Sequence, residues 1–115
     1  MKYQIFGEKV VANLPWQDKP SGCRDVVWRY DQNPIINRDI IPVSNSVFNS
    51  AAVPFGDGYA GVFRVDTRAR DMELHAGFSK DGIHWELNEE RIVFDTDIEE
   101  MSEFIYGYDP RVVFI

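Results

Sequence analysis

The sequence predicts an all-β protein, and three observations support this prediction. Short apolar runs recur between residues 43 and 94, and turns containing Gly and Asp separate them. No window shows the 3.6-residue period of an amphipathic helix. Aromatic residues make up 14% of the chain, a proportion that favours β-structure. With 115 residues, 44% of them hydrophobic, the chain can build one small domain.

Residues 1–42 are predicted to form an irregular N-terminal arm. Prolines at positions 15, 20, 34 and 42 interrupt it, and Lys19-Pro20-Ser21-Gly22 is typical of a turn. The arm contains one strand-like run, Asp25–Tyr30. Trp16 and Trp28 indicate that the arm packs against something, either the same domain or another subunit.

Residues 43–115 are predicted to form a four-stranded antiparallel sheet and the first strand of another. The segments Gly56-Asp57-Gly58 and Lys80-Asp81-Gly82 are hairpin turns of the Asp-Gly type. A sheet of four strands joined by tight turns is the blade of a β-propeller, so this region is interpreted as one blade and the start of a second. The expected strands are Val47–Val53, Tyr59–Val65, Glu73–Ser79, Ile83–Leu87 and Tyr108–Ile115.

Charge and cysteine content exclude several classes of function. The net charge is -7, from 19 acidic and 12 basic residues, which argues against a nucleic-acid partner because phosphate binding needs a basic stripe. The one cysteine, Cys23, excludes an internal disulfide and fits a reducing cytoplasm, where we expect the protein. The first ten residues carry charges and no apolar run, so no signal peptide is expected. No segment is long enough to cross a membrane.

Asp109 is the candidate catalytic acid. It lies between Tyr108 and Pro110 at the start of an apolar run, and a proline favours extended geometry for the residue before it. The innermost strands of a propeller line its central channel, which would place Asn49 and Ser50 beside Tyr108 and Asp109. Amide, hydroxyl, phenol and carboxyl groups that converge on a pocket match the hydroxyls of a sugar. The alternative is that Asn49 and Asp109 only cap strand ends.

A second cluster contains Arg64, Arg68 and Arg70, around the end of the second predicted strand. Guanidinium groups bind phosphate through forked donors, so these residues are candidate phosphate ligands. Arg64 follows an apolar run and is expected to be buried and to face the pocket. Ion pairs with neighbouring carboxylates such as Asp66 are the alternative, above all for Arg68.

The segment Ser79–Trp85 resembles the Asp-containing turn that closes hairpins in sugar-processing propellers. Its role is expected to be structural, with Asp81 accepting backbone N–H bonds and Gly82 in a left-handed conformation. His75 and His84 lack the spacing of zinc ligands, so no metal site is expected and both are assigned to packing or to the surface.

Five motifs, in order along nearly the whole chain, resemble glycoside hydrolase family 130. They are Asn33-Pro34-Ile35, Phe48-Asn49-Ser50-Ala51, Gly61-Val62-Phe63-Arg64, Ser79-Lys80-Asp81-Gly82-Ile83-His84-Trp85 and Tyr108-Asp109-Pro110-Arg111. The resemblance implies a five-bladed β-propeller, of which this chain would be the N-terminal portion, and activity on β-mannosides. The form of residues 25–30 and 48–55 looks closest to the 4-O-β-D-mannosyl-D-glucose phosphorylases.

The resemblance also implies a reaction. Inorganic phosphate would cleave 4-O-β-D-mannosyl-D-glucose with inversion, to α-D-mannose 1-phosphate and glucose, without a cofactor. Asp109 matches the general acid of the family, with its proton passing through the mannosyl 3-hydroxyl. Arg70 matches a phosphate ligand, with Arg68 as its rival. The residues that match positions around the mannosyl unit are Asn49, Ser50, Arg64 and Tyr108.

Two other functions remain open, a β-mannoside hydrolase of the same family and a non-catalytic sugar-binding or assembly module. The further blades of such a propeller, with their phosphate ligands, are not in this sequence. We therefore expect the chain alone to show no turnover, and to associate as a homo-oligomer or through exposed strand edges. Arg64 should lower the pKa of Asp109, so burial or the incoming phosphate would have to raise it again.

Overall fold

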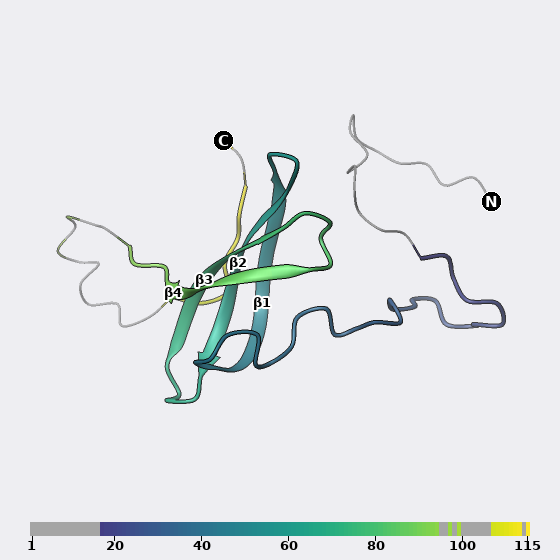
Figure 1. Ribbon diagram of the computed structural model, residues 1–115, viewed down its shortest axis with the longest axis horizontal. Coiled ribbons are helices and arrows are strands. Elements are labelled where there is room, and N and C mark those ends of the chain that lie inside the picture. Colours follow the sequence, from purple (N-terminus) through teal and green to yellow (C-terminus); the bar gives the residue numbers. More distant parts are fainter. Residues whose placement is uncertain (1–16, 95–96, 98, 100–106, 114) are drawn as a thin grey trace.

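The computed structural model describes residues 17–94, 97, 99, 107–113 and 115. Its centre is one antiparallel sheet of four strands in the order β1-β2-β3-β4 (Figure 1). The strands are β1 (Ser44–Phe55), β2 (Gly58–Thr67), β3 (Met72–Ser79) and β4 (Trp85–Arg91). The described residues contain no α-helix. The all-β prediction is confirmed, and the sheet has the form of one propeller blade.

The four strands predicted between residues 43 and 94 all form, with somewhat different bounds. Strands β1 and β2 extend beyond the predicted bounds at both ends, and the turn between them lies at residues 56 and 57 as expected. Strand β4 begins at Trp85 instead of Ile83, because residues 80–84 are all needed for the turn. The predicted boundary between arm and blade, at residue 42, is close to the start of β1.

The strand-like run Asp25–Tyr30 is not a strand. A turn closed by the Cys23 N–H and the Pro20 carbonyl, 3.1 Å apart, comes before it. The side chain of Gln17 accepts a hydrogen bond from the backbone N–H of Asp31 at 3.0 Å, at the end of the run. Apolar residue types alone therefore predicted a strand wrongly: this part of the arm bonds to a side chain of the arm itself, and no strand among the described residues pairs with it. Trp16 lies outside the described residues.

The fifth predicted strand, Tyr108–Ile115, is also absent from the described residues of that range. Asp109 has a φ of 52°, in the left-handed region, although Pro110 was expected to hold it extended. Aspartate adopts this region more readily than most residues, and one such residue interrupts an extended run. The segment then crosses the sheet instead of pairing with an edge: Gly107 lies near Leu74 of β3, and Asp109 reaches β2 and β1.

Strand β2 shows where the core lies. Its side chains alternate between half-buried and buried along all ten residues, the pattern of a strand with one well-packed face. On that face Phe63 is 2% exposed, and its ring meets Trp85 of β4 edge-on, with centroids 5.0 Å apart. His75 of β3 lies opposite Phe63 and is fully buried, and its Nδ1 donates to the Asn88 carbonyl at 2.9 Å.

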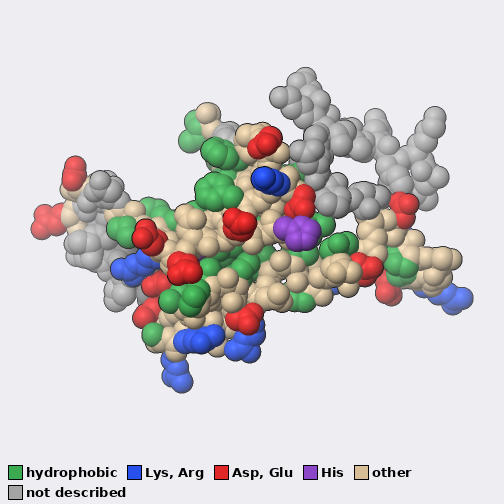
Figure 2. All heavy atoms as spheres, viewed as in Figure 1, with side chains coloured by type: hydrophobic (Ala, Val, Ile, Leu, Met, Phe, Trp, Pro, Cys, Tyr) green, Lys and Arg blue, Asp and Glu red, His purple; other side chains and the backbone are tan. Residues whose placement is uncertain are grey.

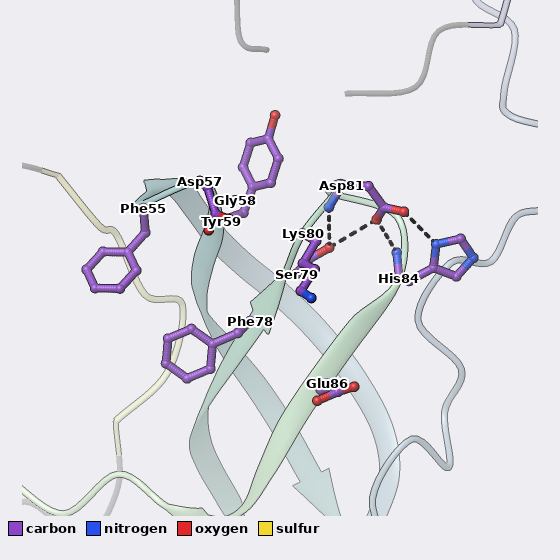
Figure 3. Close-up of a pocket in the computed structure, with 10 residues that line it drawn as sticks. All are labelled: Phe55, Asp57, Gly58, Tyr59, Phe78, Ser79, Lys80, Asp81, His84 and Glu86. Carbon is purple, nitrogen blue, oxygen red and sulfur yellow. Dashed lines mark hydrogen bonds and ion pairs between the residues drawn. The ribbon is translucent and has the colours of Figure 1, made fainter. Parts of the chain in front are cut away.

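The turn between β3 and β4 is built around Asp81. Its Oδ1 accepts the backbone N–H of His84 at 2.8 Å, and its Oδ2 pairs with the His84 ring at 2.7 Å (Figure 3). The same Oδ1 also accepts the backbone N–H of Ile83 at 2.9 Å. These bonds hold the pKa of Asp81 well below its usual range, and the bond from the His84 side chain has the largest effect. Gly82 has a φ of 76°, and Trp85 Nε1 donates to its carbonyl at 3.0 Å. The structural role predicted for Asp81 and Gly82 is confirmed.

The ring of Phe63 rests on a pair of glycines from neighbouring strands. Gly61 of β2 lies opposite Gly77 of β3, and a Cβ at either position would be 2.7 Å from Phe63 Cε2. Real Cβ atoms do not approach a ring so closely, so both positions need glycine for space. The aromatic ring in turn covers the backbone of the two glycines, and both are buried.

We predict that Gly77→Ala lowers the free energy of unfolding by about 1–3 kcal/mol, because the new methyl group overlaps the Phe63 ring. Chemical denaturation of the natural-length protein measures this loss. The cost should shrink in a Phe63→Leu background, where the ring edge is gone. Equal costs in the two backgrounds would show that the ring is not the cause.

Candidate active site around Asp109

A β-bulge in β1 turns Asn49 toward the face of the sheet that carries Arg64. Phe48 lies opposite Arg64 and Ser50 lies opposite Phe63, so Asn49 is an extra residue with no partner on β2. A bulge of this kind bends the strand and changes the direction of a side chain. Without it, strict alternation would send Phe48 and Asn49 to opposite faces.

Asp109 accepts two hydrogen bonds on one oxygen. Asn49 Nδ2 donates to Oδ1 at 2.7 Å and Arg64 Nη1 donates to the same atom at 3.2 Å. The two donors are 60 and 45 residues away in the sequence. The Arg64 guanidinium also lies over the Tyr108 ring, 5.6 Å from its centroid. The structure thus brings together four of the predicted site residues: Asn49, Arg64, Tyr108 and Asp109.

These contacts hold the pKa of Asp109 below its usual value. The hydrogen bond from Asn49 is the largest cause, and burial, the second largest, opposes it. The hydrogen bond and charge of Arg64 act in the same direction as Asn49, and so does the charge of Arg111. Asp109 is therefore ionised at neutral pH when no ligand is bound. The expected effect of Arg64 is confirmed, and the larger effect of Asn49 is a finding of the structure.

Sequence reasoning missed two residues of this site, Asp66 and Phe48. Asp66 binds Arg64 through both oxygens: Nε to Oδ1 is 3.0 Å and Nη2 to Oδ2 is 3.4 Å. Phe48 lies on the guanidinium, with its ring centroid 5.3 Å from Arg64 Cζ. The i, i+2 spacing of Arg64 and Asp66 on one strand was the available signal, because such residues share a face. From the sequence, Asp66 is expected only as an ion-pair partner of the arginines, the alternative to phosphate binding.

The structure does not bring the other predicted residues to Asp109. Ser50 donates its hydroxyl to the Phe48 carbonyl at 2.8 Å and lies opposite Phe63. Arg68 follows the end of β2, about 10 Å or more along the strand from Arg64, and its Nε donates to the Ser44 carbonyl at 3.3 Å. Arg70 is exposed in the next turn, with a φ of 72°.

Figure 2 shows basic side chains gathered at the end of the sheet where the β2–β3 turn lies. Arg68 and Arg70 belong to this turn, and Arg64 is farther along β2. The single arginine cluster expected from the sequence is therefore divided along the strand. The roles predicted for Arg68 and Arg70 in phosphate binding, and for Ser50 in sugar binding, stay predictions.

A hollow of about 490 Å³ lies elsewhere, between the β1–β2 and β3–β4 turns. Figure 3 shows Phe55 and Phe78 on one side of it and the Asp81–His84 pair on the other. The centroids of the two phenylalanine rings are 6.4 Å apart. None of the residues that surround Asp109 lines this hollow, so its volume is not evidence about the acid.

The two histidines lie in different surroundings. His75 is buried and His84 is largely exposed, as packing and surface residues should be. Within residues 17–94 and the described positions after them, no group of three or more His, Cys, Asp or Glu side chains is placed to hold a metal ion. The same residues include no helix that is long and apolar enough to cross a membrane.

We predict that Asn49→Ala raises the pKa of Asp109 toward its usual value, because the strongest bond to the carboxylate is lost. Carbon NMR titration of the labelled Asp109 carboxyl group measures this change. Asn45→Ala is a matched control, since Asn45 is the extra residue of the other bulge in β1 and its Oδ1 accepts from Arg38. An unchanged titration in Asn49→Ala would contradict the assignment.

Comparison with known proteins agrees with the resemblance seen in the motifs. The family described as beta-1,4-mannooligosaccharide phosphorylase matches residues 8–115. A β-1,4-mannooligosaccharide phosphorylase of Ruminococcus albus is 60% identical over 121 aligned positions, which cover 100% of this chain and 36% of the relative. The chain thus spans little more than a third of that relative's length. The chain therefore belongs to glycoside hydrolase family 130.

Proposed function

We propose that this chain contributes the acid-bearing part of the active site of an inverting phosphorylase that cleaves β-1,4-mannosides. The observation that carries the proposal is the carboxylate of Asp109, held by Asn49 and Arg64 on one face of the sheet. The name of the Ruminococcus albus relative, and the family described by the same activity, support it.

The arrangement of the acidic groups favours phosphorolysis over hydrolysis. An inverting hydrolase needs one carboxyl group as acid and a second as base to activate water. Among the described residues, Asp66 is the other carboxylate bonded to Arg64, and both of its oxygens are occupied by that guanidinium. Phosphate is already an anion and needs no base. One acid beside guanidinium groups is therefore sufficient for phosphorolysis.

In the proposed reaction, a phosphate oxygen attacks the anomeric carbon from the face opposite to the glycosidic oxygen. The bond from that carbon to the glycosidic oxygen breaks, and Asp109 supplies the proton that the leaving sugar takes up, through the mannosyl 3-hydroxyl. The proton lost by hydrogen phosphate as its ester forms replaces the one that Asp109 gave. The products are α-D-mannose 1-phosphate and the free acceptor sugar.

The low pKa of Asp109 is compatible with this role if phosphate binds close to it. In the ligand-free protein Asn49 and Arg64 hold the carboxylate ionised. A nearby phosphate dianion favours the neutral form of the carboxyl group, because like charges repel, and it competes for the positive charge of the arginines. Binding of the second substrate would thus prepare the acid for proton transfer.

The aromatic rings beside Asp109 suit a sugar ligand. Phe48 is 48% and Tyr108 57% exposed, and both lie at the Arg64 guanidinium. Aromatic side chains with a few polar groups are the usual lining of small-molecule sites. Two substrates are proposed: 4-O-β-D-mannosyl-D-glucose, from the motifs, and β-1,4-mannooligosaccharides, from the name of the relative. They differ in the acceptor sugar.

We predict that the natural-length protein releases mannose 1-phosphate from mannosylglucose or from β-1,4-mannobiose only when phosphate is present. Asp109→Asn should lower kcat by about 100-fold or more, because the proton donor is lost, while mannoside binding is largely retained. The assay compares both substrates with and without phosphate. Asp71→Asn, a surface carboxylate in the β2–β3 turn, is the control and should retain activity.

Each other outcome has a distinct meaning. Release of free mannose without phosphate would make the protein a hydrolase. Mannoside binding without any product would leave a sugar-binding or assembly module. Full activity in Asp109→Asn would remove Asp109 from the reaction.

A further inference from the structure

Asp66 stands behind Arg64 in a line of three charged groups. It occupies the Nε and Nη2 atoms of the guanidinium at 3.0 and 3.4 Å, and the remaining nitrogen, Nη1, donates to Asp109 at 3.2 Å. One arginine therefore bridges two carboxylates. Because a guanidinium is planar, fixing two of its nitrogens also fixes the direction of the third.

The surroundings of Arg64 strengthen this constraint. The guanidinium lies over the Phe48 and Tyr108 rings, and the Arg64 side chain is 19% exposed. Asp66 is two residues away on the same strand, so the regular geometry of β2 sets the spacing between the two groups. A long side chain that would otherwise sample many rotamers is held in one arrangement by contacts on the sheet.

We propose that Asp66 is a positioning residue, which acts through Arg64 to aim Nη1 at Asp109 and to share the guanidinium charge with it. The inference rests on the proposed function, in which Asp109 must carry a proton at the working pH. A guanidinium that was paired with Asp109 alone would hold that carboxylate ionised more strongly. Asp66 limits this effect while it keeps the Arg64 contact in place.

The other described groups that face Asp109 do not offset the positive charge of Arg64. Asn49 approaches from β1 and is neutral, Arg64 approaches from β2, and Arg111 acts from the same segment as Asp109. All three favour the ionised form of Asp109. Asp66 is the negative group bound to the same guanidinium, so its removal should favour ionisation of Asp109 further.

The test compares Asp66→Asn and Asp66→Glu in the natural-length protein, with phosphorolysis of mannosylglucose or mannobiose as the assay. The acid must be protonated, so kcat/KM falls as pH rises through its pKa. In Asp66→Asn we expect this alkaline limb to move to lower pH, because the negative charge is gone. Asp66→Glu retains the negative charge but moves the carboxylate that makes two bonds to Arg64. In this variant the alkaline limb should stay in place while kcat/KM falls about 10- to 100-fold.

Asp71→Asn is the matched control, because it removes the same charge from the β2–β3 turn and should leave the profile unchanged. A wild-type profile in Asp66→Asn would overturn the proposal, as would wild-type kcat/KM in Asp66→Glu. If Asp66→Asn does not fold, the Asp66→Glu comparison decides by itself. If the wild-type protein shows no phosphate-dependent activity, the proposed function fails instead, and the two failures are distinguishable.

Discussion

The register of β2 is the constraint on which the rest of the structure depends. Phe63 and Arg64 are neighbours in the chain and point to opposite faces of the sheet, one into the packed core and the other toward Asp109. The ring of Phe63 fits only over the Gly61–Gly77 pair and against Trp85. A slip of one residue would place Arg64 in the core and Phe63 at the site. Core packing therefore decides where the guanidinium lies.

The bulge at Asn49 decides which side chain of β1 reaches Asp109. It adds one residue to the strand without disturbing the pairs on either side, Phe48 with Arg64 and Ser50 with Phe63. The amide of Asn49 then reaches the same oxygen of Asp109 as Arg64 does. An irregular position in one strand and a regular position in the next together hold a carboxylate that comes from far along the chain.

Electrostatics at this site is a balance between two carboxylates that share one guanidinium. Arg64 is bonded to Asp66 more extensively than to Asp109, and its pKa is raised chiefly by Asp66. Asp109, with a left-handed φ of 52°, is held by bonds from two strands. Backbone conformations of this kind cost energy and are found where the surroundings maintain them, often at functional sites. The unusual backbone at Asp109 is consistent with a carboxylate placed for chemistry.

Residue patterns alone were enough to predict the all-β class, the four strands between residues 43 and 94 and the structural role of the Asp81 turn. These features depend on local signals that can be recognised within a few residues: alternation of apolar and polar residues, Asp-Gly turns and short apolar runs. The motif order was also sufficient to indicate the family. Long-range contacts in the folded chain were needed to show that Gly107 and Asp109 lie against the sheet without forming a strand, and that Asn49 is a bulge. Only the tertiary structure decided that Asp66 binds Arg64 while Arg68 and Arg70 lie apart. Most of these features depend on contacts between residues on different segments, which residue types and spacing do not specify. For Asp66 the i, i+2 spacing shows that it shares a face with Arg64, but not which carboxylate the guanidinium binds.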